Sequence, residues 1–461
     1  MNNSEMYVGL DIGTTSIKVL VCENVKGQLK VVGVGVAPSA GMSRGVITDI
    51  DQTAQAISRA VSQAAEKANT SISNVVVGLP ANYLQMKRAH GMITVGASGQ
   101  SREISDDDVK NVASETMAQS IPPEREVIAL LPQQYTVDGF DGIKDPRGMV
   151  GVRLELSAIM YTGPKTIIHN TKKAVEKAGL HIQDLVVDPI ATGFDLLNDG
   201  EQDFGTVVID LGGGQTTTSI IHDHQLKFTY VDPEGGRFIT RDISTVLNTS
   251  YRHAEQLKRD HGYADSSQAD PDLEISVDVV GQNDPGSCTE EYLAEIIQAR
   301  VEQIFDRTKK RLDAIHTPDL PGGIILLGGV AALPGIKDLA EQVFDTNVKV
   351  YVPDQMGIRH PGYATALALA MYESRMSEVD TLVKQTILSD GLIQSPHVAA
   401  AANHNYQPQR QTQQPAQNKR PAGSRPRPKR EQRPKRQRQS HAKKSGDSMS
   451  RVKKFFNNFF E

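Results

Sequence analysis

The chain has 461 residues, more than one hydrophobic core usually organises, so we expect several domains. Its two cysteines, Cys22 and Cys288, exclude a disulfide-stabilised scaffold and favour a reducing compartment. The net charge of −5 conceals a division: residues 401–461 carry 16 basic and three acidic groups, a net charge of +13, whereas the remaining residues carry 34 basic and 52 acidic groups, a net charge of −18.

Neither a secretory signal nor a spanning helix is expected. The start of the chain lacks the basic and apolar regions of a signal peptide. The most apolar run, residues 322–336, is shorter than the roughly 18–20 residues that cross a bilayer, and Gly and Pro interrupt it. These features favour a cytoplasmic protein.

Apolar β-rich runs alternate with helical patterns up to about residue 375. This alternation predicts an α/β architecture. Thr289, with two acidic residues after it, predicts the start of a long helix. The expected strands are 6–13, 17–25, 73–80, 206–214 and 322–329, and the expected helices are 51–68 and 289–315.

Two segments depart from the pattern. Residues 83–163 contain a Pro pair and loop-like stretches, which indicate an inserted subdomain. From about residue 389 the chain becomes rich in Gln, Pro, Arg and Lys. Such a composition buries too little apolar surface to offset chain entropy, so we expect a disordered basic linker.

One sequence pattern occurs twice. "MYVGLDIGTTSIKVLV" begins at residue 6 and "TVVIDLGGGQTTTSII" at residue 206, and each reads apolar strand, Asp, Gly, small polar residues, apolar strand. The repeat predicts two related half-domains that face each other.

The first of these loops, between two strands, is a hairpin and lacks the GK[ST] signature of a Walker A loop. Its glycine permits a tight turn, and its hydroxyl and backbone donors suit a phosphate. An ordinary glycine hairpin is the alternative reading, which we favour for this loop taken alone. The residues concerned are Asp11, Gly13, Thr14, Thr15, Ser16 and Lys18.

The second loop strengthens the prediction of a phosphate site. It places Gly212, Gly213 and Gly214 after Asp210. Asp11 and Asp210 would then project from facing loops and hold Mg²⁺ through water. Two plain hairpins remain the alternative. Gly328 and Gly329, after a third apolar strand, would leave room for a purine or its ribose.

Taken in this order, the motifs resemble the actin–Hsp70–sugar kinase ATPase superfamily, and within it the FtsA family of bacterial cell division proteins. The resemblance covers about residues 5–375 and the last dozen. It rests on two phosphate motifs, an adenosine motif, two connecting helices and three FtsA-like stretches. These are "LDIGTTSIKV", "VIDLGGGQTTTS", "IILLGGVAALPG", 186–197, 361–370, 45–50, 235–244 and 254–258.

The resemblance implies a two-lobed actin-like ATPase fold with an inserted subdomain, a disordered basic linker and a C-terminal amphipathic helix. The first lobe would comprise residues 1–82 and 164–199, with the insertion at 83–163. The second lobe would comprise 200–250 and 321–388, with a small subdomain at 251–320. The linker would be 389–448 and the helix 449–461.

The resemblance further implies that ATP and Mg²⁺ bind between the lobes. The two hairpin loops named above would meet the phosphates or, through Asp11 and Asp210, the metal. Gly235, Gly236 and Arg237 would border the nucleotide, Glu255 and Lys258 would reach the ribose and base, and Gly328 and Gly329 would lie at the base.

The second loop departs from the superfamily pattern, because Gln215 replaces a threonine and Thr217 an acidic residue. Asp188 stands where relatives carry a water-orienting Glu or Gln, and it could accept a proton from the attacking water. A helix N-cap before Pro189 is an equal alternative for Asp188. We expect weak ATPase activity or none, with ATP mainly an assembly cofactor.

The family also implies partners. The small subdomain would bind the C-terminal peptide of FtsZ, with Arg300 as a contact; a solvated helix face is the alternative. The inserted subdomain would contribute to self-assembly into filaments and to recruitment of other divisome proteins.

Residues 449–461 place their apolar side chains within a sector of about 140° on a helical projection, bordered by basic residues. Such a helix lies in an anionic lipid interface. Nucleic-acid binding would leave the one-sided aromatic pattern unexplained, and docking into the protein's own groove would leave the basic tract unexplained. The membrane residues would be Val452, Lys453, Lys454, Phe455, Phe456, Phe459 and Phe460.

We therefore expect an ATP-binding filament protein at the cytoplasmic face of the membrane that tethers the FtsZ ring there, with no specific nucleic acid partner. The alternative is a phosphotransferase or chaperone-type ATPase of the same superfamily. We expect no peptide-binding β-domain after the ATPase motifs, which favours the tether.

Overall fold

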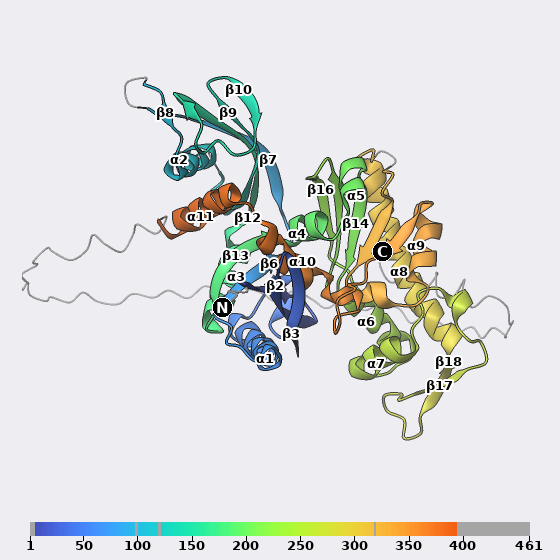
Figure 1. The fold of residues 1–461 in the computed structure, drawn as a ribbon. Coiled ribbons are helices and arrows are strands. Elements are labelled where there is room, and N and C mark those ends of the chain that lie inside the picture. Colours follow the sequence, from blue (N-terminus) through green and yellow to red (C-terminus); the bar gives the residue numbers. More distant parts are fainter. Residues whose placement is uncertain (1–4, 97–99, 119–120, 318–319, 394–461) are drawn as a thin grey trace, which may run out of the picture. The chain divides into compact units, whose positions relative to one another are not determined.

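The computed structural model of the chain describes residues 5–96, 100–118, 121–317 and 320–393. By their internal contacts the residues form two units, Met1–Asp390 and Gly391–Glu461. The elements named below lie in the first unit, except for the last residues of helix α11. Within that unit, Figure 1 shows two lobes, each built on a five-stranded sheet, and a further sheet beside the first lobe.

The sheet of the first lobe has the strand order β13-β6-β1-β2-β3. Strands β1, β2 and β3 form an antiparallel meander, and β6 and β13 run parallel to β1. Because side chains alternate along β2, Val19 and Val21 join the core under α1, whereas Leu20 and Cys22 join the core under α10. The elements are β1 (Glu5–Ile12), β2 (Ser16–Val25), β3 (Gln28–Pro38), β4 (Met42–Ser43), β5 (Val46–Ile47), α1 (Ile50–Ala68), β6 (Asn74–Leu79), α3 (Lys165–Lys177), β13 (His181–Val187) and α4 (Asp188–Asp195).

Glycines let the helices approach this sheet closely. A Cβ on Gly35 of β3 would collide with the carbonyl oxygen of Ala60 in α1. A Cβ on Gly9 of β1 would collide with the carbonyl oxygen of Ala366 in α10. Packed helices therefore cover both faces of the sheet, and the first glycine loop lies at the end of its strands.

The second lobe repeats the arrangement, with the strand order β16-β15-β14-β19-β20. Its first three strands form an antiparallel meander, and β19 and β20 run parallel to β14. The two sheets thus share one topology, as the repeated sequence pattern predicts. The elements are α5 (Asp199–Phe204), β14 (Thr206–Leu211), β15 (Thr216–His222), β16 (Gln225–Asp232), α6 (Gly236–Val246), α7 (Tyr251–His261), η2 (Ser266–Gln268), β17 (Glu274–Val277), β18 (Gly286–Thr289), α8 (Glu290–Ala314), β19 (Ile324–Leu327), η3 (Gly329–Ala332), α9 (Ile336–Phe344) and β20 (Val348–Val350).

Helix α8 begins where its sequence predicts. The Thr289 side chain accepts a hydrogen bond from the backbone N–H of Tyr292 at 3.1 Å, and two glutamates occupy the first turn. Its buried stripe, which includes Leu293, Ile297 and Ile304, belongs to one continuous core with the second-lobe sheet. Helix α8 thus packs directly on the lobe that carries the second glycine loop.

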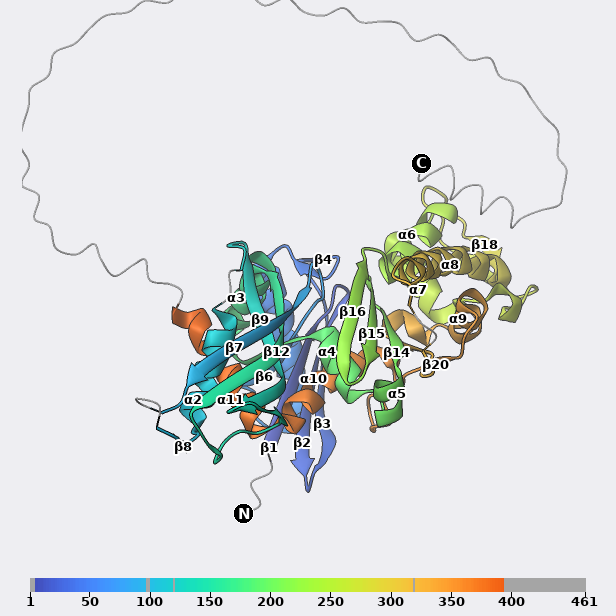
Figure 2. The same cartoon turned by 90° about the horizontal axis from the view of Figure 1, so that it is seen from above.

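Two helices lie between the lobes, as the sequence predicts. Helix α4 contacts α10 (Ala364–Arg375), which follows η4 (Pro361–Tyr363). Their core contains Ile190 and Ala368 together with Val76 of the first sheet and Val208 of the second. In Figure 2 both helices lie between the two sheets.

The inserted subdomain is a four-stranded sheet with the order β10-β9-β12-β7, which packs against α2 and α11. Its core joins Val112 of α2 and Leu156 of β12 to Val383 of α11. The elements are β7 (Gln85–Thr94), β8 (Arg102–Glu103), α2 (Asp106–Met117), β9 (Arg125–Val137), β10 (Phe140–Ile143), β11 (Val150–Gly151), β12 (Arg153–Pro164) and α11 (Glu378–Ile393).

The predicted extent of the second lobe, through residue 388, is wrong at its end. Helix α10 packs on the first sheet and on α4, because its small apolar residues fit the close approach at Gly9. Helix α11 packs on the insertion, because Val379, Leu382 and Val383 form an apolar stripe. Helix α11 also continues to Ile393, beyond the predicted start of the linker at 389.

Candidate functional site

The two glycine loops face each other across the lobes. A Cβ on Gly213 would collide with the side chain of Thr15, and a Cβ on Gly214 with that of Thr14. Only glycine permits this approach, so the loops line one narrow site. A Cβ on Gly13 would lie 2.7 Å from the carbonyl oxygen of Ser16, which shows how tight the first turn is.

A cluster of charged side chains lies beneath the loops. Asp11 and Lys18 are paired across the β1–β2 ladder, and the Lys18 Nζ lies 2.9 Å from Asp11 Oδ2. Asp210 is the penultimate residue of β14, and Asp188 is the first residue of α4. The side chains of Lys18 and Asp11 remain 18% and 16% exposed, so a ligand can reach the cluster.

Burial and mutual repulsion change the acidity of this cluster. Burial, together with the charge of Asp11, raises the pKa of Asp210 to about 7, against the opposing effects of Lys18 and of a hydrogen bond with Thr365. Burial and the charges of Asp11 and Asp210 raise the pKa of Asp188 well above its usual range. Burial alone would lower the pKa of Lys18, but Asp11 and Asp210 raise it. Excess negative charge of this kind favours a bound cation.

Asp188 does not act as the cap of α4. The N-cap is Val187, and no side chain forms a capping hydrogen bond there, so the alternative reading of Asp188 is wrong. Its carboxyl lies against Gly78 of β6, where a Cβ would collide with Oδ1. That Oδ1 atom is buried and has no hydrogen-bond partner among the described residues. An unpaired buried oxygen next to the cluster is available to a ligand or to water.

The remaining glycine positions border the same site. Gly328, with φ +92°, faces Asp210, because a Cβ there would collide with Asp210 Oδ1. Gly329 has no atom within 4 Å of the position of a Cβ, so this side of the loop is open. The backbone N–H of Gly236 donates to the carbonyl of Gly212 at 2.9 Å, and that of Arg237 donates to Gly213 at 2.8 Å.

Glu255 and Lys258 come together on α7, where their side chains are 2.7 Å apart. The Lys258 Nζ also donates to the carbonyl of Gly236 at 3.2 Å and to the Thr240 hydroxyl at 2.9 Å. Burial lowers the pKa of Lys258 despite the charge of Glu255. Lys258 therefore supports the Gly235–Gly236 loop from behind, and its predicted contact with a base stays a prediction.

The structure adds residues that the sequence did not single out. Thr365 of α10 forms the hydrogen bond with Asp210. In the sequence, only its position in a predicted connecting helix indicated a place near the site. Gln215 lies against Gly45, where a Cβ would collide with its amide, and its Oε1 is buried without a partner among the described residues. The side chain of Arg237 reaches the carbonyl of Met42 at 3.4 Å, so the β4–β5 hairpin meets the second lobe.

The prediction that Arg300 contacts a partner peptide is wrong. Its side chain has no exposed surface, and it forms ion pairs with Glu234 at 2.8 Å and Asp242 at 2.5 Å. The stripe on α8 that carries Arg300 faces the lobe interior. The predicted membrane residues, 452–456, 459 and 460, lie outside the described part of the chain.

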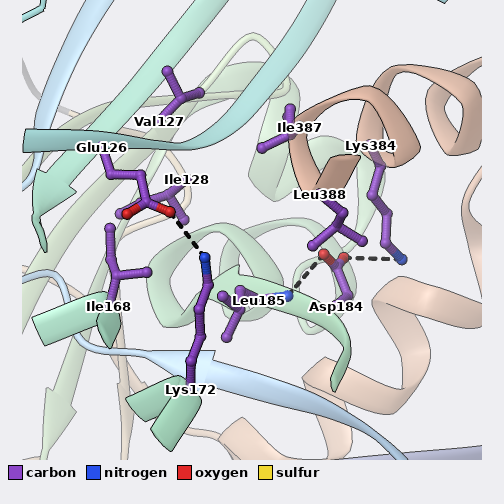
Figure 3. A pocket seen from close by; sticks show the side chains of 10 residues that line it. All are labelled: Glu126, Val127, Ile128, Ile168, Lys172, Asp184, Leu185, Lys384, Ile387 and Leu388. Atoms are coloured by element: carbon purple, nitrogen blue, oxygen red, sulfur yellow. Dashed lines mark hydrogen bonds and ion pairs between the residues drawn. The ribbon is translucent and has the colours of Figure 1, made fainter. Parts of the chain in front are cut away.

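A small pocket of about 20 Å³ lies away from the glycine loops, among the insertion, the first lobe and α11. Figure 3 shows Lys172 paired with Glu126 and Lys384 paired with Asp184, at 2.8 Å and 3.2 Å. These pairs satisfy one another, and apolar side chains fill the rest of the lining. We interpret this pocket as a packing junction.

Within the described ranges, no three His, Cys, Asp or Glu side chains come close enough to hold a metal ion by themselves. A Mg²⁺ ion bound at Asp11 and Asp210 would thus complete its shell with water and ligand oxygens, which is the usual preference of Mg²⁺. The unpaired Asp188 oxygen fits such a hydrated ion. Likewise, no helix in the described segments has the length and apolar character to cross a bilayer.

Comparison with known proteins agrees with this geometry. The family model described as "Cell division protein FtsA" matches residues 207–368, and the model described as "SHS2 domain inserted in FTSA" matches residues 81–162. Cell division protein FtsA of Enterococcus faecalis is 49% identical over 100% of both chains. FtsA of Bacillus subtilis is 39% identical over 82% of this chain and 86% of its own.

Solved structures show the fold. The PilM-PilN type IV pilus biogenesis complex matches with a TM-score of 0.56 at 16% identity, over 80% of this chain and 99% of its own. MreB5 of Spiroplasma citri bound to ADP matches with a TM-score of 0.50 at 13% identity, over 80% of this chain and 96% of its own. The predicted α/β actin-like fold with an inserted subdomain is thus confirmed, and the chain belongs to the FtsA family of cell division proteins.

Proposed function

We propose that the chain binds ATP with Mg²⁺ between the two glycine hairpins. The observation that carries the proposal is the charged cluster of Asp11, Lys18, Asp188 and Asp210 directly beneath loops that only glycine allows to meet. The loop amides would hold the phosphates, and Asp11 and Asp210 would hold the hydrated metal. MreB5 of Spiroplasma citri, a solved structure of similar fold, was bound to ADP.

ATP serves assembly more than turnover in this proposal. Asp188 stands where relatives carry a Glu or Gln, and its side chain is shorter than that of Glu, so its carboxyl would reach less far toward an attacking water. The second loop also carries Gln215 and Thr217 where the superfamily has a threonine and an acidic residue. We expect slow hydrolysis at most.

The finer role is that of a membrane tether. We propose that ATP-bound copies polymerise on the cytoplasmic membrane, hold the FtsZ ring through its C-terminal peptide and recruit other divisome proteins. Family membership supports the division role, and the amphipathic, basic-bordered pattern of residues 449–461 supports contact with anionic lipid. The peptide contact lies elsewhere than Arg300, since that side chain is buried.

Substitution of Gly213 tests the nucleotide site. Gly213→Ala would force its methyl group against Thr15 and widen the loops, so we expect ATP affinity to fall about tenfold or more. Gly200→Ala is the matched control, because a Cβ at Gly200 in α5 meets only Asn198 Oδ1, at 3.5 Å. Equilibrium binding of a fluorescent ATP analogue gives both affinities. Unchanged affinity in the folded Gly213 variant would refute the site.

A phosphotransferase or chaperone-type ATPase of the same superfamily is the alternative. The actin-like fold alone is compatible with it. A turnover assay separates the two functions, because robust phosphorylation of a small molecule would contradict the tether.

A further inference from the structure

Two arginines of helix α8 form ion pairs with the segment that runs from the end of β16 into α6. Arg300 and Arg307 are seven residues apart, two helical turns, so they occupy one face of α8. Both side chains form ion pairs with carboxylates. Neither residue belongs to the set that would touch ATP.

Arg300 is the largest fully buried side chain of the described chain. Its Nε and Nη2 donate to the two oxygens of Asp242 at 2.5 Å and 3.0 Å, a bidentate pair. Its Nη1 donates to Glu234 Oε2 at 2.8 Å. The aromatic ring of Phe238 lies 5.8 Å from the guanidinium.

Arg307, two turns further along α8, pairs with Glu234 as well. Its Nε donates to Asp232 Oδ2 at 2.6 Å, and its Nη2 donates to Glu234 Oε2 at 2.7 Å. Glu234 Oε2 therefore bridges the two arginines. Burial alone would lower the pKa of Arg307, but its bonds to Asp232 and Glu234 raise it.

The three carboxylates all belong to one short segment, residues 232–242, which runs from the end of β16 into α6. This segment lies against the second glycine loop. The Thr216 hydroxyl donates to the carbonyl of Glu234 at 3.0 Å, and the N–H groups of Gly236 and Arg237 donate to the loop carbonyls of Gly212 and Gly213. A Cβ on Gly235 would collide with the Gly212 carbonyl oxygen.

Buried ion pairs are an expensive way to gain stability, because desolvation offsets their attraction, and apolar residues of similar size often stabilise as well. What such pairs do provide is a fixed geometry. Here the pairs with Asp232 and Glu234 end on the loop that contacts Gly212 and Gly213, and the pair with Asp242 ends on α6, the helix that this loop enters. The arrangement links α8 to the backbone that would hold the phosphates.

We propose that Arg300 and Arg307 are positioning residues of the nucleotide site: together they hold residues 232–237 against the second glycine loop. The inference rests on the proposed binding of ATP. It makes nucleotide affinity depend on α8, a helix that contributes no residue to the site. By linkage, a ligand that displaces α8 would lower ATP affinity, and ATP would oppose that ligand by the same factor.

Arg307→Gln on the full chain tests the proposal, since Arg307 is 30% exposed and its loss leaves Arg300 in place. We expect its affinity for a fluorescent ATP analogue to fall at least fivefold. Arg307→Lys keeps the positive charge but lacks the planar guanidinium, so it should lose less ATP affinity than Arg307→Gln. Lys310→Gln, an exposed residue one turn further along α8, is the matched control and should change affinity less than twofold.

Melting temperatures without nucleotide separate positioning from a purely structural role. A structural role would lower the melting temperature of Arg307→Gln and leave the ATP dissociation constant within twofold of the original, which would overturn the proposal. Glu234→Gln provides a second test of the positioning role if Arg307→Gln fails to fold. Because Glu234 bridges both arginines, this variant should also lose affinity, and unchanged affinity would again overturn the proposal.

The two levels of failure are distinguishable. If the unaltered chain binds no ATP, the proposed nucleotide site is wrong. If it binds ATP and the folded Arg307→Gln and Glu234→Gln variants bind equally well, only the positioning role is wrong.

Discussion

Buried carboxylates in this chain fall into two kinds, distinguished by what faces them. Asp184 has an ammonium partner, Lys384, at 3.2 Å and a backbone N–H from Leu185 at 2.8 Å. Asp188 and Asp210 face another carboxylate, and Asp188 Oδ1 has no partner among the described residues. Burial raises the pKa of all three. A satisfied carboxylate belongs to the fold, whereas an unsatisfied cluster indicates a ligand site.

Asp184 gives a prediction for the pH dependence of stability. Burial raises its pKa to about 6, against the attraction of Lys384, so the folded state binds a proton more tightly than the unfolded state does. The stabilisation from this proton is complete below about pH 4 and disappears as the pH rises through 6. The shift of about two pKa units corresponds to roughly 3 kcal/mol.

Urea unfolding of the unaltered chain and of Asp184→Asn from pH 4 to pH 7 measures this contribution. The free energy of unfolding of the unaltered chain should exceed that of the variant at pH 4, and this difference should fall by up to about 3 kcal/mol by pH 7. A difference that stays constant with pH would contradict the assignment.

Among the secondary structure elements, α11 shows how a helix can belong to a domain far from it in sequence. It follows α10 after two residues, yet it packs on the insertion through Val379, Leu382 and Val383. Figure 3 shows Lys384 of α11 paired with Asp184 of the first lobe. Lys384 also pairs with Glu373 of α10, at 2.6 Å. Helix α11 therefore joins the insertion to the first lobe.

Val383→Ala tests this role of α11. Val383 is 1% exposed, so its truncation should lower the free energy of unfolding by about 1–3 kcal/mol through the cavity that it leaves. Gln385→Ala, an exposed position on the same helix, should change it by less than about 0.5 kcal/mol. Chemical denaturation measures both, and equal effects would show that α11 is not docked as described.

Much of the fold could be predicted from sequence because its signals are local. The period-two strands, the repeated Asp-Gly hairpins and the Thr289 cap lie within a few residues of one another. The burial of Arg300 could not be predicted, because its carboxylate partners lie 58 and 66 residues away in sequence. The predicted assignment of α10 and α11 to the second lobe is wrong for the same reason, since only tertiary packing decides which sheet a terminal helix covers.

At the scale of the whole molecule, the chain combines the proposed nucleotide site with a basic C-terminal sequence of opposite charge to the rest. Burial of one aromatic ring contributes at best about 1.5–3 kcal/mol, and each basic residue near anionic lipid about 1 kcal/mol. One tail helix would therefore hold a membrane only reversibly. The proposed polymer would present many tails at once, and multivalency would make the attachment stable. Assembly and membrane binding should thus depend on each other.

The most direct measurement is negative-stain microscopy of polymers on an anionic lipid monolayer, with and without ATP and Mg²⁺. The unaltered chain should form polymers on the monolayer only with nucleotide. Phe455→Asp/Phe459→Asp should leave the monolayer bare, whereas Asn457→Asp/Asn458→Asp, which adds the same charge on the polar face, should still assemble there. Polymers without ATP, or equal coverage by the phenylalanine variant, would contradict the proposed nucleotide-dependent membrane tether.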